Sequence, residues 1–458
     1  MSKYSTEAEA LFFKGNRLME TGDVADAEAC FKQAVQMSPD FAEAYANLGL
    51  LLAKRGDTAA AEVHYQRAIT LAPDYSETHL NLGALFASAK RYDEAEAAYR
   101  RAITLSPASP AGWSNLGVLF ACMQREVEAE HCHRTAMALD ASYAMSRFNL
   151  SYLLLRQGRF EEGWQCLEAR NWYAGLMPHL NCPRWQGESL FGKSVLLSLE
   201  AGLGDVIQFC RYAALLKEQG ALAITLICHP PLKALLDSLE SVDAVIPYDE
   251  PIPESGFDYW TPLLSLPYHC KTRLHTIPAT IPYLQAPADR IEKWAALLPR
   301  DGLRVGLVWK GNPLFENDAD RSLPGLEVLA PLWEVAGVRF ICLQKGAGEH
   351  EAVHPPGGLA LIDLGTHLTD FADTAAAISG LDLVISVDTA VAHLAGALGK
   401  PCWVMLPDYK ADWRWLKDRS DSPWYPGIMR LFRQPSMGDW TTVVAEMSSA
   451  LQHLTGKG

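Results

Sequence analysis

Small and large apolar residues recur at a spacing of 34 positions through the first third of the chain. The repeats start at Ala8, Ala42, Ser76, Pro110 and Ala144. Small side chains let two helices approach closely, large apolar side chains fill the space between them, and a proline ends each second helix. The spacing therefore predicts about five helical pairs over residues 1–170. The defining residues are Gly15, Gly49, Gly83 and Gly117 at position 8, Ala34, Ala68, Ala102 and Ala136 at position 27, and Pro39, Pro73 and Pro107 at position 32.

The apolar pattern changes after Glu168. Residues 171–192 bring several proline and glycine residues together, which predicts a junction. Beyond it, buried apolar runs alternate with helical segments, an order that builds parallel sheets. We expect two Rossmann-like α/β domains, at residues 193–300 and 301–458. The predicted strands are residues 194–199, 224–228, 242–246, 304–309, 339–343, 383–387 and 402–406, and the predicted helices are residues 206–219, 290–300 and 390–398.

The helical repeats resemble the tetratricopeptide repeat (TPR), and they carry a second regularity. Asn47, Asn81, Asn115 and Asn149 occupy position 6 of four successive repeats. Asparagine is a mediocre helix former, and its amide can pair with the backbone of an extended polypeptide. The alternative is that these amides bond between neighbouring helices. The superhelix of O-GlcNAc transferase is similar, and its asparagine ladder implies that the groove holds a protein or peptide acceptor.

Residues 382–407 combine a strand, a turn, a helix and a second strand. Asp388 and Thr389 have the composition of a helix start, and Gly399 ends the helix. Open α/β sheets bind ligands at such turns, where the free N–H groups of the helix start suit a phosphate or diphosphate. His393 lies one turn further on the same face, within reach of a phosphate or ribose. The alternative is an ordinary capped helix with a satisfied His393.

Gly202 and Gly204 belong to a predicted turn between a strand and a helix, and Asp205 follows them. Glycine allows the backbone to approach a ligand closely, so the carboxylate can face that ligand. A carboxylate suits a general base, which takes the proton of an attacking hydroxyl. The alternative is that Asp205 only caps the following helix.

A loop rich in polar residues follows the strand at 304–309. Lys310, Asn312 and Arg321 lie in it, and the negative charge of a diphosphate calls for cations such as the lysine and the arginine. The loop also contains a DxD sequence, Asp318 to Asp320, but a pair of loop aspartates needs no metal explanation, so we expect no metal site.

Two further groups of residues follow predicted strands. Gln344 and Lys345 could meet the base of a nucleotide, although they are equally typical of a solvated loop. Trp413, Trp415, Trp424 and Tyr425 could stack on a sugar or close the cleft, and packing between domains is the alternative.

Several segments together resemble the bacterial TPR-containing glycosyltransferases related to the heptosyltransferase family. They are SLEAGLGDVIQFCRYAALL, GLVWKGNP with DADRSLP, FADTAAAISGLDLVISVDTAVAHLAGALGKPCWVMLP, and DWRWL with DSPWYP and RLFRQ. The resemblance implies a GT-B fold and an inverting transfer from a nucleotide-diphosphate sugar, without catalytic metal or cofactor. It implies that Asp205 is the base, that Arg321 contacts the diphosphate, and that Thr389 contacts phosphate. Lys310 departs from the pattern, because a small residue is expected there.

Composition limits the partners. The chain has 458 residues, 49% of them hydrophobic, and a formal net charge of -14, which argues against nucleic acid and anionic membranes. Its 10 cysteines include no CxxC pair, so neither a zinc site nor a disulfide framework is expected. The amino end lacks a signal pattern and no apolar run approaches the length of a membrane span, so we expect a cytoplasmic protein. Assembly into a homo-oligomer is compatible with the sequence.

The leading interpretation is a glycosyltransferase that moves a sugar from a nucleotide donor to a protein in the repeat groove. Two alternatives stay open. A glycan or lipid could accept the sugar, as in the heptosyltransferases, while the repeats serve assembly. The chain could also be a scaffold whose α/β module binds nucleotide without catalysis, although intact Asp205, Arg321 and Asp388 argue against such decay.

Overall fold

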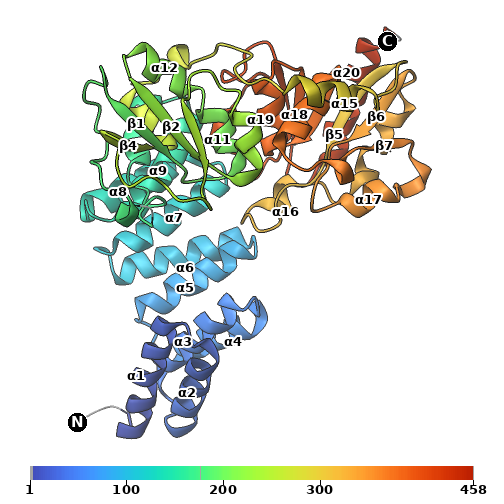
Figure 1. The fold of residues 1–458 in the computed structure, drawn as a ribbon. Helices are drawn as coiled ribbons and strands as arrows, with labels where there is room; N and C mark the ends of the chain where they lie inside the picture. Colours follow the sequence, from blue (N-terminus) through green and yellow to red (C-terminus); the bar gives the residue numbers. More distant parts are fainter. Residues whose placement is uncertain (1–3, 176, 457–458) are drawn as a thin grey trace. The chain divides into compact units, whose positions relative to one another are not determined.

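The computed structural model describes residues 4–175 and 177–456 and divides into two compact units, Met1–Leu153 and Leu154–Gly458. The first three residues of the predicted repeat domain, Leu176 of the predicted junction and the last two residues lie outside the described chain. The first unit holds helical repeats, and the second contains two parallel sheets accompanied by helices (Figure 1). The fold class expected from the sequence is therefore confirmed.

The helices of the repeats follow one another in pairs (Figure 1). In repeats two to five, the first helix begins at the repeat start that the sequence predicts. The boundary between the two compact units falls within α9, so α10 belongs to the second unit. The helices are α1 Thr6–Thr21, α2 Val24–Met37, α3 Ala42–Lys54, α4 Thr58–Leu71, α5 Ser76–Ser88, α6 Tyr92–Leu105, α7 Pro110–Cys122, α8 Glu126–Leu139, α9 Ala144–Arg156 and α10 Phe160–Leu167.

Glycine at position 8 allows the two helices of a repeat to touch. A Cβ atom at Gly49 would lie 2.7 Å from the ring of Tyr65, closer than carbon atoms in a packed interior approach. Any larger residue would therefore displace one helix of the pair. The same contact occurs in four repeats, between Gly15 and Phe31, Gly49 and Tyr65, Gly83 and Tyr99, and Gly117 and His133.

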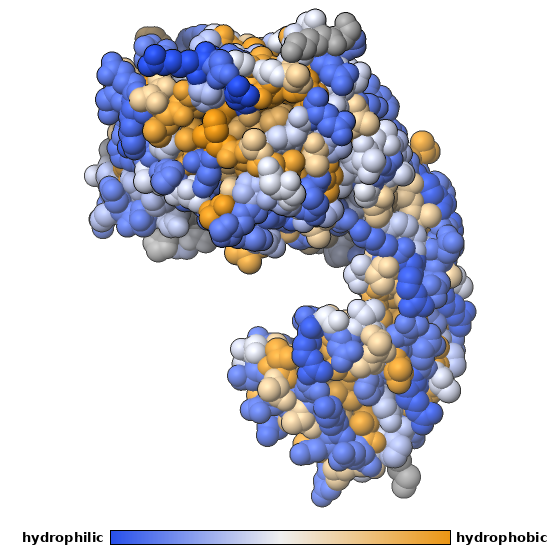
Figure 2. Space-filling model, turned by 90° about the vertical axis from the view of Figure 1, so that its right-hand side faces the viewer, coloured by the Kyte–Doolittle hydropathy of each residue, from blue (hydrophilic) through white to orange (hydrophobic). Residues whose placement is uncertain are grey.

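The surface of the first unit is mainly hydrophilic on the side that Figure 2 shows. Ion pairs join neighbouring repeats at 2.5 to 3.0 Å, and each of them is partly exposed. Exposed pairs of this kind contribute little individually, so contacts between apolar side chains supply most of the stability of the array. The pairs are Arg55 with Glu28, Arg91 with Glu62, and Arg125 with Glu96.

The first sheet of the second unit has four parallel strands in the order β3-β2-β1-β4. Leu196 of β1 lies opposite Thr225 of β2 and Trp260 of β4. The β1 side chains from Val195 to Leu197 are completely buried, as in strands that helices cover on both faces. The elements are η1 Met177–His179, β1 Ser194–Ser198, α11 Leu203–Phe209, α12 Tyr212–Glu218, β2 Ala223–Cys228, η2 Pro230–Leu232, α13 Lys233–Leu236, β3 Ala244–Pro247, β4 Tyr259–Pro262, η3 Leu263–Ser265, α14 Leu266–His269 and η4 Leu274–Thr276.

The second sheet has six parallel strands in the order β10-β9-β8-β5-β6-β7. The chain runs from β5 to one edge through β6 and β7, then returns to the other side of β5 for β8, β9 and β10. The direction of strand addition therefore reverses between β5 and β8. The elements are α15 Ala288–Ala295, β5 Leu303–Val308, α16 Asp318–Arg321, η5 Leu326–Glu334, β6 Val338–Cys342, α17 Glu349–Val353, η6 Pro356–Gly358, β7 Leu361–Asp363, η7 Gly365–His367, α18 Phe371–Ser379, β8 Leu383–Val387, α19 Ala390–Ala397, β9 Cys402–Leu406, η8 Trp413–Trp415, β10 Met429–Arg433 and α20 Trp440–Leu454.

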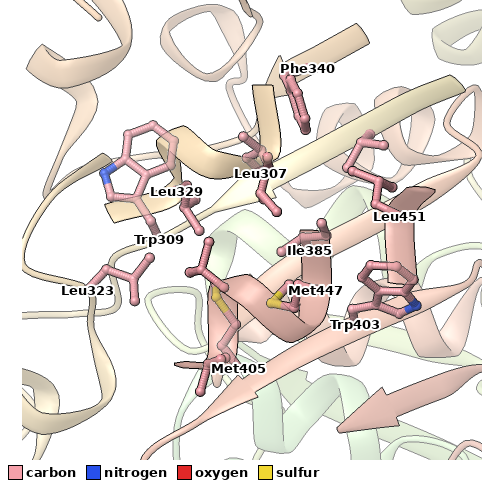
Figure 3. Close-up of a cluster of buried hydrophobic side chains, with 14 of the residues drawn as sticks. Leu307, Trp309, Leu323, Leu329, Phe340, Ile385, Trp403, Met405, Met447 and Leu451 are labelled. Carbon is pink, nitrogen blue, oxygen red and sulfur yellow. The ribbon is translucent and has the colours of Figure 1, made fainter. Parts of the chain in front are cut away.

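One face of the second sheet carries the core shown in Figure 3. Leu307 and Ile385, from the adjacent strands β5 and β8, belong to it. Leu329 of η5 and Met447 of α20 belong to the same cluster, and all four side chains are completely buried. This packing holds β5 and β8 rigidly side by side, so the loops that follow them start from fixed positions.

The predicted strands agree with the structure to within two residues, and the differences lie in short or interrupted elements. The helix expected over residues 206–219 is divided into α11 and α12 at Cys210 and Arg211. Strands β4, β7 and β10 were not predicted, because β7 is three residues long and β4 ends in a proline. None of the described helices combines the length and apolar content needed to cross a membrane.

His133 should make the stability of the first unit sensitive to acid. Its side chain is 1% exposed, its Nδ1 atom has no hydrogen-bond partner among the described residues, and burial lowers its pKa from 6.5 to about 4. As pH falls below 6.5, the unfolded chain takes up a proton that the folded chain refuses, so stability falls. The stabilisation of His133→Phe relative to wild type should therefore grow by ~2 kcal/mol between pH 7 and pH 5.

Urea unfolding followed by far-UV circular dichroism at both pH values measures this difference. Phenylalanine fits the position in the first repeat, where Phe31 contacts Gly15. His131→Gln is the control, because His131 is exposed on the same helix. A His133→Phe gain that is equal at pH 7 and pH 5 would contradict the assignment of a buried neutral imidazole.

Candidate functional site

A cavity of about 650 Å³ lies within the second unit, at the carboxyl ends of strands from both sheets. The loop after β1 lines one side, and the segments after β5, β6 and β8 line the other. Strand addition reverses between β5 and β8, and open α/β sheets bind ligands at such a switch point. The volume is within the range typical of pockets for small ligands.

Every base and donor candidate predicted from the sequence lines this cavity. They are Gly202, Gly204, Asp205, Lys310, Asn312, Arg321, Gln344, Lys345, Asp388, Thr389 and His393. Asp370, Asp412 and Arg414 also line it, although the sequence analysis assigned them no role. The four predicted acceptor-binding asparagines belong to the first unit.

Asp205 both caps α11 and lines the cavity. Its Oδ2 atom accepts a hydrogen bond from the backbone N–H of Gly202 at 2.8 Å, which satisfies the start of the helix. Its Oδ1 atom forms an ion pair with Arg414. A carboxylate offers about four acceptor positions, so these contacts leave capacity for a hydroxyl group. The two roles that the sequence left as alternatives are thus compatible in one side chain.

Gly204 allows the start of α11 to contact the start of α19. A Cβ atom at Gly204 would lie 3.0 Å from Cδ2 of His393 and 3.5 Å from Cα of Ala390. The second of these neighbours is backbone, which moves only if the helix moves. Because the two helices belong to different sheets, this contact determines how closely the two walls of the cavity approach.

Arg414 extends from the second sheet's side of the cavity to Asp205. Its Nε atom donates to Oε1 of Gln208 at 2.6 Å, and its Nη1 atom lies 3.0 Å from both carboxylate oxygens of Asp412. Its Nη2 atom donates to Asp205. The DWRWL sequence contained a weak signal, because an arginine between two tryptophans is a candidate for burial and then needs a carboxylate partner. No local pattern connects it to Asp205.

The first turn of α19 presents backbone donors at the cavity. Thr389 precedes the helix, and its hydroxyl makes no capping bond but lies 3.0 Å from the hydroxyl of Ser386. Among the described residues, the backbone N–H groups of Ala390 and Val391 have no acceptor. A helix start with free N–H groups attracts anions, so this turn suits a phosphate.

His393 lines the cavity but is fixed by its neighbours. Its Nδ1 atom lies 2.9 Å from the hydroxyl of Tyr425, and its ring stacks on Trp415 with the centroids 5.2 Å apart. Burial lowers its pKa well below the usual value, so the ring is neutral. The structure therefore shows a bonded histidine in the cavity wall.

Arg321 is the predicted cation that remains most available to an anion. Its Nε atom donates to Oδ1 of Asp318 at 3.2 Å, and its guanidinium group stacks on the ring of Phe315 at 4.3 Å. Stacking orients the guanidinium plane and leaves N–H donors at its edge. Lys310 donates its Nζ hydrogen to the carbonyl of Pro324 at 2.5 Å, so this group is already engaged.

Gln344 connects two loops of the cavity wall. Its Oε1 atom accepts from the backbone N–H groups of Trp309 and Lys310 at 2.9 Å each. Its Nε2 atom donates to the carbonyls of Lys310 and Lys345 at 3.1 and 3.2 Å. These bonds occupy most of the amide's capacity, so Gln344 shapes the wall. Asn312 and Lys345 are exposed loop residues at the cavity.

The aspartates of the DxD sequence show no metal-ligand arrangement. Asp318 is 8% exposed, and its Oδ1 atom accepts from the hydroxyl of Ser322 at 2.9 Å as well as from Arg321. In residues 4–175 and 177–456, no group of three or more histidine, cysteine, aspartate or glutamate side chains could hold a metal ion.

Asp388 carries a carboxyl group whose charged form is disfavoured. Burial raises its pKa from 3.8 to about 6, and the nearby charge of Asp412 acts in the same direction. Arg321 and Arg414 act in the opposite direction. Groups with perturbed pKa values inside a cavity often belong to functional sites, so Asp388 is a strong candidate for contact with a ligand.

The four asparagines of the repeats fall into two groups. All are half-buried on the first helices of successive repeats. The Nδ2 atom of Asn47 donates to Oδ1 of Asn16 at 2.7 Å, a bond between neighbouring repeats. For Asn81, Asn115 and Asn149, no side-chain hydrogen bond to another described residue is present. Three of the four amides are therefore not engaged by side-chain hydrogen bonds within the described chain.

Comparisons with known families identify two kinds of domain. Residues 14–76 and 76–109 match the tetratricopeptide repeat. Residues 333–404 match glycosyltransferase family 9 (heptosyltransferase), and this segment contains Asp388 and the start of α19. The chain therefore carries tetratricopeptide repeats and a glycosyltransferase family 9 domain. These matches confirm the resemblance seen in the sequence. The family 9 match also supports the assignment of the chain as a glycosyltransferase.

One relative and two solved structures illustrate the similarity. Protein FlbA of Caulobacter vibrioides is 29% identical over 336 residues, which are 68% of this chain and 55% of FlbA. The chain thus spans about half the length of that relative. The structure of pilF from Pseudomonas aeruginosa has a TM-score of 0.34 at 20% identity and covers 36% of this chain and 74% of its own. A thermophilic TPR protein of Thermus thermophilus, TTC0263, has a TM-score of 0.33 at 20% identity over 37% of this chain and 99% of its own.

Asp388→Asn should stabilise the protein, and more so in alkaline solution. The pKa of the folded state, about 6, lies above the ordinary 3.8, so the charged carboxylate costs stability above pH 6. This cost disappears as pH falls through the folded-state pKa and then the ordinary pKa of Asp388. The folded state binds the proton more tightly than the unfolded state, so protonation favours folding. Asparagine has no charge to bury, so its gain in unfolding free energy should be roughly 1 kcal/mol larger at pH 8 than at pH 5.

Thermal unfolding of both proteins at pH 5 and pH 8 measures the gain. Asp382→Asn is the matched control, since Asp382 precedes the same strand but its pKa is lowered by a hydrogen bond from Arg304. That substitution should destabilise the protein at pH 8. If Asp388→Asn also destabilises it there, the carboxylate is held by favourable contacts and the argument is wrong.

Proposed function

We propose that the chain is an inverting glycosyltransferase of the GT-B type, which moves a sugar from a nucleotide-diphosphate sugar to a protein or peptide acceptor. The observation that carries the proposal is the cavity at the switch point of the second sheet. Asp205, the open start of α19 and the guanidinium group of Arg321 line this one cavity. The match of residues 333–404 to family 9 supports the same reaction class.

The donor's diphosphate needs positive charge, because its departure concentrates negative charge on the phosphate oxygens. The free N–H groups of Ala390 and Val391 and the guanidinium group of Arg321 meet this need. An arginine and a helix start can hold a leaving diphosphate without a metal ion, so we propose a metal-independent transfer that uses no cofactor.

Asp205 acts as the base in this proposal. It takes the proton of the acceptor hydroxyl while the hydroxyl oxygen bonds to the anomeric carbon of the sugar. The bond from that carbon to the diphosphate oxygen breaks, and its electron pair leaves with the nucleoside diphosphate. A single displacement of this kind inverts the configuration at the anomeric carbon.

The repeats supply the acceptor in this proposal. Asn81, Asn115 and Asn149 succeed one another at the same position of three consecutive repeats, and none of their amides bonds to another residue that the structure describes. Amides in a row can pair with the backbone of an extended polypeptide whatever its side chains are, which suits an enzyme with several protein substrates. The reaction would take place in the cytoplasm, where nucleotide sugars are at hand.

Transfer to protein should be observable in a host lysate supplied with a panel of nucleotide-diphosphate sugars and EDTA. Mass spectrometry should detect proteins that gain one sugar residue from one of the donors. Asp205→Asn should lower the rate by ~10²–10⁴, with donor affinity nearly unchanged, because asparagine preserves the cap but cannot take a proton.

A different experimental result would contradict each of three parts of the proposal: metal independence, the protein acceptor and the enzymatic activity. A strict need for Mg²⁺ or Mn²⁺ would contradict metal independence. Sugar found on glycans or lipids, and not on proteins, would replace the protein acceptor. Failure to consume any donor, with or without metal, would remove the enzymatic assignment.

Replacing Asn81, Asn115 and Asn149 together by alanine should weaken acceptor binding and leave the fold intact. Alanine is a better helix former, and no described residue depends on these amides for a hydrogen bond. Each lost pairing should cost roughly 0.5–1.5 kcal/mol in binding of a protein acceptor. Hydrolysis of the donor by water should be unaffected, because the donor cavity lies in the other unit.

Acceptor titrations and donor hydrolysis on the triple variant measure these two quantities. The control replaces Thr70 and Thr104 by alanine, since both are exposed on second helices and bond only within their own helix. Unchanged acceptor affinity in a folded triple variant would show that the asparagines do not bind the acceptor. If the triple variant does not fold, the asparagines instead stabilise the contacts between neighbouring helices.

A further inference from the structure

The ion pair between Asp205 and Arg414 joins residues from the two sides of the cavity. Asp205 belongs to α11 of the first sheet's side, and Arg414 belongs to η8, which follows β9 of the second sheet. The side chain of Arg414 is 9% exposed and that of Asp205 is 23% exposed. The arginine is therefore nearly buried, while part of the carboxylate still reaches the cavity.

A guanidinium group removed from water must be fully paired, because an unpaired buried charge is costly. Each of the three nitrogen atoms of Arg414 has a partner, namely Gln208 at Nε, Asp412 at Nη1 and Asp205 at Nη2. The planar fork of arginine places these donors in fixed directions. Asp412 and Gln208 thus fix the orientation of Arg414, and Arg414 in turn fixes Oδ1 of Asp205.

The second oxygen of Asp205 is fixed independently. The backbone N–H of Gly202 donates to Oδ2, so the carboxylate is held at both ends. A base must meet the acceptor hydroxyl within hydrogen-bond reach, and a side chain with free rotation would meet it only part of the time. Two fixed oxygens leave one defined set of lone pairs for the incoming hydroxyl.

Arg211 provides a comparison, because it also connects the two sides. Its Nη1 atom donates to the carbonyl of Trp424 at 2.7 Å, and its Nη2 atom donates to the hydroxyl of Tyr283 at 2.7 Å. Like Arg414 it is almost completely buried. It contacts no carboxylate of the cavity in the described chain, so it ties the two sides together without touching the base.

We propose that Arg414 is a positioning residue that orients Asp205 for proton transfer, so that the base is complete only when the two sides of the cavity are docked. The proposal rests on the function proposed above and extends it. It assigns to Asp412 and Gln208 the task of holding Arg414. The donor side of the cavity thereby controls the group that activates the acceptor.

A double-mutant cycle on transfer rate tests the proposal. Arg414→Ala should lower kcat at least ~10-fold while the donor KM changes little, because the loss concerns orientation of the base. Arg414→Ala combined with Asp205→Asn should be no slower than Asp205→Asn alone, because Arg414 acts through Asp205. Guanidinium ion added to Arg414→Ala should restore part of kcat.

Arg211→Ala is the matched control. It removes a buried arginine between the same two sides. Its fold reduction in kcat should therefore multiply with the fold reduction caused by Asp205→Asn when the two substitutions are combined. If the reductions in kcat caused by Arg414→Ala and Asp205→Asn also multiply in the double variant, Arg414 only holds the two sides together. That result would overturn the proposal. Circular dichroism checks the fold, and Arg414→Lys and Asp412→Asn replace Arg414→Ala in the cycle if that variant does not fold.

The outcomes also separate this inference from the proposed function. If the wild-type chain transfers sugar and the Arg414 cycle is multiplicative, only the positioning role is wrong. If the wild-type chain consumes no donor, the proposed function fails and the inference fails with it.

Discussion

The contact between the starts of α11 and α19 is the constraint on which the site depends. At Gly204 the two helices approach closely, since a Cβ atom there would lie 3.0 Å from the ring of His393 and in van der Waals contact with the backbone of Ala390. The contact brings the carboxyl ends of β1 and β8 together, although these strands belong to different sheets. One wall of the cavity therefore supplies a carboxylate and the other an open helix start. Neither sheet alone could place these groups around one ligand.

Charge in the cavity is balanced by pairing some groups and leaving others open. Asp205 and Asp412 are paired with Arg414, so these three charges largely compensate one another. Arg321 and the start of α19 stay accessible to an anion, and Asp388 is left with a pKa raised to about 6. Stability alone would favour neutral residues at such positions, so this arrangement is compatible with the anionic ligand of the proposed function.

Local pattern predicts most of the charged and amide side chains that line the cavity, and long-range contacts explain those that it missed. The predicted residues of the cavity lie in the segments that follow β1, β5, β6 and β8, and buried strands are recognisable from short apolar runs. The interruption of the helix at Arg211 was missed, because this arginine bonds to Trp424 and Tyr283, far along the chain. The role of Arg414 was missed for the same reason, since its partner Asp205 lies 209 residues earlier. No spacing rule connects residues that only the packing of two sheets brings together.

The departure of the fifth repeat from the pattern has a physical cause in its partners. Its second helix, α10, packs within the α/β unit, where the ring of Trp164 lies 6.3 Å from that of Trp424. Arg170 stands where four earlier repeats have alanine, and it bonds to Glu200 through two contacts of 2.8 Å. Glu200 opens the turn that leads to Asp205. The segment that ends the repeats therefore holds the turn that leads to the proposed base, and its side chains make contacts within the α/β unit in place of the repeat contacts.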